Sequence, residues 1–153
     1  MNWEIVFKLA NVWALMCWAA LVLLPRTEFL KRAMLYGGIG LLCVAYGSLL
    51  GLILGGVLDP GVPAGSSQAS FNTIDGVRAI FAADSGVTIG WMHYLAFDLF
   101  AGLWIAQDAD TRGVHRLIQA PILILTLFAG PVGMLIWLPV RAAVVKKQAE
   151  AGS

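Results

Sequence analysis

The chain has 153 residues, of which 59% are hydrophobic and only 12% are charged, and its mean hydropathy is +0.81. A soluble domain carries about 25% charged residues, so this composition excludes the soluble class and indicates an integral membrane protein of one domain. A formal net charge of +1 excludes the basic class of nucleic-acid-binding proteins.

Four apolar stretches are long enough to cross a bilayer, since a spanning helix needs about 20 mainly apolar residues. We predict an all-α integral membrane fold with four transmembrane helices at about 4–25, 33–57, 86–107 and 116–141. These helices form a single transmembrane domain over residues 1–145. A flexible C-terminal tail is expected over 146–153.

The first predicted helix carries a polar stripe. Glu4, Lys8 and Asn11 fall at i, i+4 and i+7 and therefore share one face. Glu4 and Lys8 are expected to form an ion pair at the helix end. Asn11 either belongs to this interfacial stripe or points into the bundle and hydrogen-bonds a neighbouring helix or a ligand. The helix should end at Leu24, because the residue before a proline resists helical geometry.

The second predicted helix is rich in glycine. Gly47, Gly51 and Gly55 form two small-xxx-small pairs, which let helix backbones approach closely. We expect tight helix packing here, with a groove for a flat ligand as the alternative. A polar loop over 59–70 follows. Apolar residues then recur at helical spacing over 71–83, which predicts a short amphipathic interfacial helix, either a plain anchor or a lid between helices.

The last predicted helix contains prolines. Pro121 and Pro131 lie inside the stretch, and a proline within a span kinks the helix. We therefore predict a bend at Gly130. The positive-inside rule gives a near tie, with five cations after the first and third helices and four elsewhere, slightly favouring both termini outside. The five are Arg26, Lys31, Arg32, Arg112 and Arg116, and the four are Arg78, Arg141, Lys146 and Lys147.

The third helix carries polar residues within an apolar span. A carboxylate facing lipid costs about 2.5–3.5 kcal/mol on insertion scales, so Asp98 should face protein, water or a ligand. Tyr94 lies one turn before Asp98, and its phenol can donate to the carboxylate. His93 lies five residues before Asp98, which places the two about 140° apart around the helix. They therefore do not share a face.

Three roles for His93 and Asp98 stay open on the residues alone: a polar network that fixes the bundle, an acid/base pair acting on an apolar substrate, or a proton or ion path. The only other histidine, His115, lies about 33 Å further along the chain if helical, which excludes a bis-histidine haem within one monomer. The residues indicate no certain cofactor. A transition metal held by His93 with Asp98, Glu4 or Asn11 remains an alternative.

Three segments resemble a known family. They are Gly90–Asp110, read as GWMHYLAFDLFAGLWIAQDAD, Asn11–Pro25 with its tryptophan, and Leu125–Gly133, read as LTLFAGPVG. Together they resemble the abscisic-acid-deficient-four-like membrane family, plant and bacterial proteins linked to neoxanthin formation. The resemblance covers most of the predicted transmembrane region and implies a four-helix membrane protein acting on carotenoids.

In plants this family is associated with converting violaxanthin, an epoxide, to the allenic neoxanthin. That isomerisation needs an acid to open the epoxide and a base to remove a proton, without net redox change. The resemblance implies these catalytic roles for His93 and Asp98. It implies substrate binding by Asn11, Trp13, Trp91, Tyr94, Gly102 and Trp104.

We therefore expect a carotenoid-modifying protein of isomerase type in a bacterial inner membrane, with several passes. Its partners would be a carotenoid or another polyene or lipid and the bilayer, with no nucleic acid. A homo-oligomer or a larger membrane complex is also compatible. One alternative function is metal-dependent oxidation or cleavage of carotenoids. The other is a non-catalytic pigment- or lipid-binding subunit.

Overall fold

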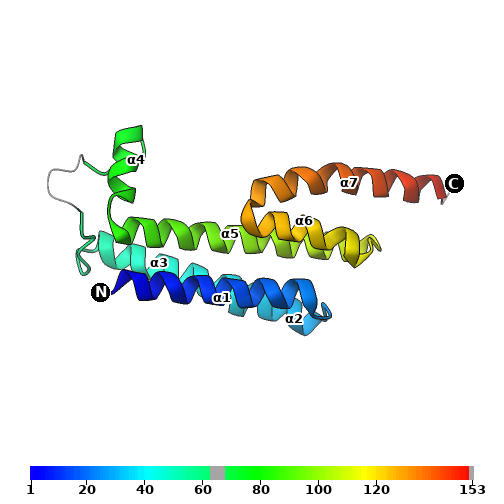
Figure 1. The fold of residues 1–153 in the computed structure, drawn as a ribbon, viewed down its shortest axis with the longest axis horizontal. Coiled ribbons are helices and arrows are strands. Elements are labelled where there is room, and N and C mark those ends of the chain that lie inside the picture. The colour runs from blue at the N-terminus through cyan, green and yellow to red at the C-terminus, as the bar shows by residue number, and fades with distance from the viewer. Residues whose placement is uncertain (63–67, 152–153) are drawn as a thin grey trace.

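The computed structural model describes residues 1–62 and 68–151, and within them it contains helices and no strands. Figure 1 shows long helices lying side by side, with a short helix standing upright at one end. The elements are α1 (Trp3–Leu23), α2 (Glu28–Arg32), the π-helix η1 (Ala33–Gly40), α3 (Leu41–Leu54), α4 (Ile74–Phe81), α5 (Asp84–Thr111), α6 (Arg116–Phe128) and α7 (Gly130–Ala151).

Among the described residues, three helices are long and apolar enough to cross a membrane: α1, the continuous helix Glu28–Leu54 formed by α2, η1 and α3, and α5. Helix α5 packs against both of the others. The first three predicted spans are therefore confirmed as helices, although α5 continues past the predicted end at 107 to Thr111. The first helix ends at Leu23 with Leu24 as its cap, as the following proline predicts.

The fourth predicted span is wrong. The stretch 116–141 forms two helices instead, because the chain leaves helical geometry at Ala129 (φ −157°, ψ 86°). Helix α7 then runs back beside α6 as the second arm of a hairpin (Figure 1). The 13 residues of α6 extend for only about 20 Å, less than the roughly 30 Å of bilayer hydrocarbon.

The position of Pro131 near the start of α7 explains why two helices form in place of one span. Pro131 is the second residue of α7, and proline is well tolerated in a first helical turn, where its missing N–H costs no hydrogen bond. Glycine then lets the two arms approach. A Cβ on Gly133 would lie 1.9 Å from the Thr126 Oγ1 of α6, so no larger residue fits there without a shift.

The hairpin changes the distribution of charge along the molecule. The two ends of the described chain lie at opposite ends of the bundle, which is not the arrangement expected for termini that share one side (Figure 1). Because α7 returns to the end of α5, with Arg141 bound to Asp108 and Gln148 bound to the Arg112 carbonyl, its cations join those of the first and third connections.

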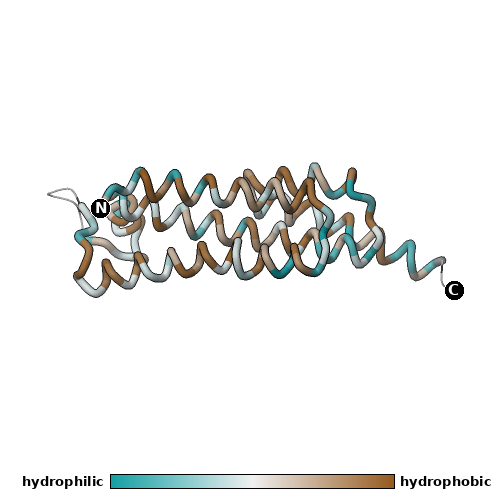
Figure 2. The backbone as a smooth tube through the Cα atoms, turned by 90° about the horizontal axis from the view of Figure 1, so that it is seen from below, coloured by the Kyte–Doolittle hydropathy of each residue, from teal (hydrophilic) through white to brown (hydrophobic). Residues whose placement is uncertain are grey.

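We call this the basic end, because it holds eight of the ten lysines and arginines. They are Arg26, Lys31, Arg32, Arg112, Arg116, Arg141, Lys146 and Lys147. Figure 2 shows hydrophilic residues gathered toward this end and along the last part of α7. Helix α7 runs through most of the predicted tail to Ala151, and residues 152–153 of that tail lie outside the described residues.

The main core lies where α1, η1, α5 and the hairpin meet. Leu99 and Leu123 and the large ring of Trp137 are fully buried there. Trp18 of α1 covers Gly102 of α5, and a Cβ on that glycine would lie 2.3 Å from the Trp18 ring. Gly102 therefore serves close packing between α1 and α5.

The glycine pairs of α3 do not pack as predicted. A Cβ on Gly47 or Gly51 would meet nothing within 4 Å, and both residues are exposed. The tightly packed glycine of this span is Gly38 in η1, whose added Cβ would lie 3.1 Å from Cys17 Sγ. The expected close packing of a glycine thus occurs in η1 rather than in α3, and it is against α1.

The predicted amphipathic helix exists as α4. The Thr73 hydroxyl caps it by accepting from the Gly76 N–H at 3.0 Å, and Gly76 and Ala79 face inward. Phe81 at its end lies against Gly90 of α5. Its position on a membrane surface stays a prediction, and the part of the preceding loop at 63–67 lies outside the described residues.

Candidate functional site

The two predicted catalytic residues lie on different sides of α5. Asp98 is buried, with 7% of its surface exposed, whereas His93 is exposed. This agrees with the angular separation that helical spacing predicts. Each residue therefore has its own surroundings.

Asp98 lies under the tip of the α6–α7 hairpin. The Gly130 N–H, at the first residue of α7, donates to Asp98 Oδ2 at 3.3 Å. The first N–H groups of a helix lack partners within the helix and carry its positive dipole end, so they suit a carboxylate. A Cβ on Gly130 would lie 2.1 Å from Asp98 Oδ1. Only glycine allows the tip to lie this close.

Tyr94 also binds the hairpin tip. Its hydroxyl donates to the Phe128 carbonyl at 2.5 Å, and the same hydroxyl is within interaction range of the Asp98 carboxylate. The phenol therefore lies beside Asp98 as predicted, but its hydroxyl donates its hydrogen bond to the Phe128 carbonyl of the hairpin. Tyr94 and Asp98 together hold the tip against the middle of α5.

An aromatic row leads from Tyr94 toward the start of α5. The Trp91 ring stacks on Tyr94 with centroids 5.0 Å apart, and its indole N–H donates to Asn11 Oδ1 at 2.9 Å. The Asn11 amide in turn donates to the Phe7 carbonyl at 2.8 Å. Asn11 thus points to a neighbouring helix, while Glu4 and Lys8 form their predicted ion pair at 2.7 Å.

We call the group Asn11, Trp91, Tyr94 and Asp98 the Asp98 site. It brings together one of the predicted catalytic residues and three of the predicted binding residues. Trp91 remains 39% exposed and Tyr94 is half-buried, so the row is open along one side.

His93 belongs to the outward face of α5. Its ring stacks on Phe97 with centroids 4.6 Å apart and lies 5.7 Å from the Tyr46 ring of α3. Phe97 is 59% exposed. The surroundings of His93 are therefore aromatic and open, and the structure does not bring it to Asp98.

Three predicted binding residues lie elsewhere. The Trp13 indole donates to the Gly37 carbonyl of η1 at 3.2 Å, where the i→i+5 bonding of a π-helix alters the backbone pattern. Gly102 lies beneath Trp18. Trp104 is partly exposed on the outward face. None of the three completes the Asp98 site.

Sequence reasoning predicts only part of a charged cluster at the basic end, the local ion pairs after the third helix. Asp108 Oδ1 accepts two bonds from Arg112, at 2.9 and 3.0 Å, and Oδ2 accepts from Trp137 at 3.1 Å and Arg141 at 2.9 Å. Asp108 raises the pKa of Arg112 through its hydrogen bonds. The i, i+4 spacing of Asp108 and Arg112 signals the local pair, but Trp137 and Arg141 reach it only because α7 turns back.

A second missed cluster surrounds Arg26, whose side chain is only 3% exposed. It donates to Asp110 Oδ1 at 2.9 Å and to Gln119 Oε1. The fully buried Gln119 also donates to Asp110 at 3.0 Å. Burial lowers the pKa of the Arg26 guanidinium, and Asp110 opposes that effect. This cluster joins the ends of α1, α5 and α6, and a lone arginine after Pro25 gives little signal of it.

In the part of the chain that the structure describes, no three His, Cys, Asp or Glu side chains gather closely enough to hold a metal ion. Two hollows with volumes of about 250 and 360 Å³ lie toward opposite ends of the bundle. Neither is lined by Asp98 or His93.

The apolar helices define a helical membrane protein, and the buried carboxylate under the hairpin tip is a candidate site in the middle of α5. A family model described as ABA DEFICIENT 4-like matches residues 5–137. The chain belongs to that family, and the resemblance inferred from its motifs is confirmed. It is thus a membrane protein of a carotenoid-related family. No curated protein and no solved structure matches the chain.

Proposed function

We propose that the chain is a membrane-embedded enzyme that binds a carotenoid along α5 and isomerises its end ring by acid/base chemistry at Asp98. The observation that carries this proposal is the Asp98 site itself. A carboxylate is buried in the middle of the longest apolar helix, beside a phenol, at the end of an aromatic row. Ionisable groups within a span are costly and commonly serve function.

The aromatic row suits a flat apolar rod. Phe7 and Trp91 lie with ring centroids 5.8 Å apart, Tyr94 continues the row, and Phe128 at the hairpin tip is 74% exposed. Figure 1 shows the hairpin alongside the second half of α5, and none of the described helices lies between its tip and α4 on that side of the bundle. A polyene could enter this side from lipid and stack on the rings.

The chemistry proposed for an epoxycarotenoid is redox-neutral. Asp98 removes the proton from the carbon next to the ring, a carbon–oxygen bond of the epoxide breaks, and a new carbon–carbon double bond forms. The Tyr94 hydroxyl gives its proton to the epoxide oxygen, which becomes an alcohol. The proton on Asp98 then passes to the Tyr94 oxygen, restoring both groups. Each positioned acid or base contributes roughly 10²–10⁴ in rate.

His93 is not part of the acid/base pair in this proposal. The sequence predicts it as a catalytic partner of Asp98, but its exposed position beside Phe97 gives it no contact with the Asp98 site. The proposal therefore assigns the acid/base pair to Tyr94 and Asp98. His93 is assigned to the lipid-facing surface of α5.

Two alternatives give different products. A metal-dependent oxygenase would cleave the polyene and release an apocarotenal, and no ligand set among the described residues adds support to it. A non-catalytic pigment-binding subunit, alone, in a homo-oligomer or in a larger membrane complex, would return the pigment unchanged. In that case Tyr94 and Asp98 would serve only to fasten the hairpin.

The test is to produce the chain in the inner membrane of a bacterial host that accumulates an epoxycarotenoid, and to analyse the pigments by chromatography and mass spectrometry. We expect a new carotenoid of unchanged mass, lost in Tyr94→Phe. Tyr36→Phe, at an exposed tyrosine of η1, is the matched control and should leave the product intact. Apocarotenals, or bound pigment without any product, would overturn the isomerase proposal.

A further inference from the structure

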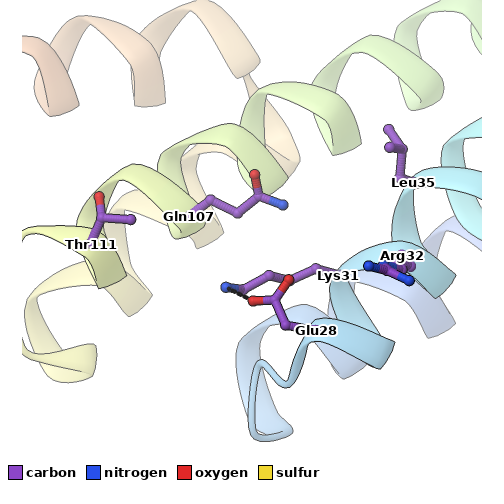
Figure 3. A pocket seen from close by; sticks show the side chains of 6 residues that line it. All are labelled: Glu28, Lys31, Arg32, Leu35, Gln107 and Thr111. Atoms are coloured by element: carbon purple, nitrogen blue, oxygen red, sulfur yellow. Dashed lines mark hydrogen bonds and ion pairs between the residues drawn. The ribbon is translucent and has the colours of Figure 1, made fainter.

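The hollow at the basic end lies between α2, the start of η1 and the last turns of α5. Figure 3 shows the Gln107 side chain extending from α5 toward α2, and the Lys31 side chain extending from α2 toward α5 beside Glu28. It has a volume of about 250 Å³. We call it the headgroup pocket, and its lining residues are Glu28, Lys31, Arg32, Leu35, Gln107 and Thr111.

The lining suits a phosphate group. Glu28 Oε1 pairs with Lys31 Nζ at 2.8 Å, and Arg32 adds a second cation, so the lining carries a formal charge of +1. The Gln107 amide projects into the same space from α5 (Figure 3). Guanidinium, ammonium and amide N–H groups are the donors that proteins use for phosphate oxygens.

An apolar stripe leads along α5 into this pocket. Phe97, Phe100 and Trp104 are 59%, 51% and 37% exposed, and their spacing of three and four residues places them on one face. Gln107 follows Trp104 by three residues and so continues that face into the pocket. A tryptophan at this position is typical of the boundary between hydrocarbon and headgroups.

The distribution of charge indicates which leaflet the pocket meets. The pocket is at the end of both long spans Glu28–Leu54 and Asp84–Thr111, and this is the basic end. An excess of lysine and arginine marks the cytoplasmic side of a membrane protein. Anionic lipids are enriched in that leaflet and attract clustered cations.

We propose that the headgroup pocket binds the phosphate of an anionic phospholipid, with one acyl chain lying along Phe97, Phe100 and Trp104. Lys31 and Arg32 supply the charge, and Gln107 supplies a neutral donor. This site lies on the outward face of α5, apart from the Asp98 site, and it does not depend on the carotenoid proposal. In this site the outward aromatic stripe binds the acyl chain of the lipid.

The test uses the full chain, purified in detergent and equilibrated with equimolar phosphatidylglycerol and phosphatidylcholine. Native mass spectrometry then measures which lipid the protein retains. We expect phosphatidylglycerol to be preferred by the wild type. The double variant Lys31→Gln/Arg32→Gln should lower its affinity roughly thirtyfold, because each cation near an anionic lipid contributes a factor of about five.

The matched control is Lys146→Gln/Lys147→Gln, which removes the same charge at the same end outside the pocket. It should change the affinity by less than about twofold, since both lysines are exposed, neither lines the pocket, and salt screens exposed charges. Equal losses in both double variants, or equal retention of the two lipids by the wild type, would overturn the site. Full displacement of the lipid by inorganic phosphate at physiological concentration would assign a free anion instead and overturn the lipid proposal. The wild-type preference is measured without any variant, so it holds as a test even if a variant misfolds.

Discussion

Two faces of α5 meet near the middle of the helix and differ sharply in what they contact. At Asp98 the helix is covered by the hairpin tip, and a backbone N–H reaches the carboxylate. At His93, little more than one turn earlier, the ring lies against Phe97 and remains exposed. The two polar residues of this span therefore have different surroundings. Only the covered face combines an ionisable group with fixed partners.

The comparison teaches that a polar residue in a span is explained first by what covers it. Asp98 is accommodated because a second helix begins directly above it. His93 has only aromatic neighbours and no comparable cover. The four predictions below test this contrast, beginning with the largest expected effect.

Asp98→Asn should lower carotenoid product by about a hundredfold or more, because an amide cannot act as the base. Its side-chain oxygen can still accept from the Gly130 N–H, so the protein should insert and fold. Product per unit of membrane-inserted protein measures the effect, with the exposed Asp84→Asn on the same helix as control. Activity within a few fold of wild type would remove Asp98 from the mechanism.

Gly130→Ala tests the geometry of the covered face. The new Cβ would lie 2.1 Å from Asp98 Oδ1, so the tip must move away, at a cost of about 1–3 kcal/mol in stability. We expect a lower thermal midpoint in detergent together with loss of product. Gly47→Ala is the control, since its added Cβ meets nothing within 4 Å. Equal midpoints for the two variants would contradict the close approach of the tip.

Trp91→Phe should have a smaller effect, because it keeps the aromatic ring and removes only the N–H that Asn11 accepts. One such bond contributes about 0.5–1.5 kcal/mol. We expect a modest fall in thermal midpoint and weaker retention of bound carotenoid. Trp104→Phe, at a ring of similar exposure on the outward face, should leave carotenoid retention unchanged. If Trp104→Phe weakened carotenoid retention more than Trp91→Phe did, the pigment would lie on the outward face.

His93→Ala should have the smallest effect on product, a fall of less than about tenfold, below the range expected for a general acid or base. The reason is its exposed place beside Phe97, away from the Asp98 site. The same pigment assay measures it. A loss as large as that of Asp98→Asn would show that both faces act in catalysis and would restore the pair predicted from sequence.

Much of the fold follows from the sequence because continuous apolar runs mark spans without reference to partners. Three spans, the amphipathic α4 and the separation of His93 from Asp98 were predictable in this way. The hairpin was not, because a proline that kinks one helix and a proline that begins another look alike in sequence. Pro131 lies in the first turn of a new helix, α7.

The partners of the polar residues depend on that same turn. Tyr94 and Asp98 could be paired by helical spacing, whereas Phe128 and Gly130 reach them only through the hairpin. The cluster at Asp108 likewise joins the end of α5 to α7, and the cluster at Arg26 joins residues from three parts of the chain. Periodicity reports which face a residue occupies, and it does not report what lies opposite.

The π-helix η1 accommodates one extra residue within its span. Its eight residues turn less per residue than the roughly 100° of an α-helix, because each N–H reaches one residue further back. They therefore turn the chain about as far as seven α-helical residues would. Deleting a single residue here would favour α-helical bonding and leave α3 in nearly the same orientation relative to α2, so Leu42 should stay in the core. The extra residue of η1 thus shifts the sequence by one position without changing the face that α3 presents to α5.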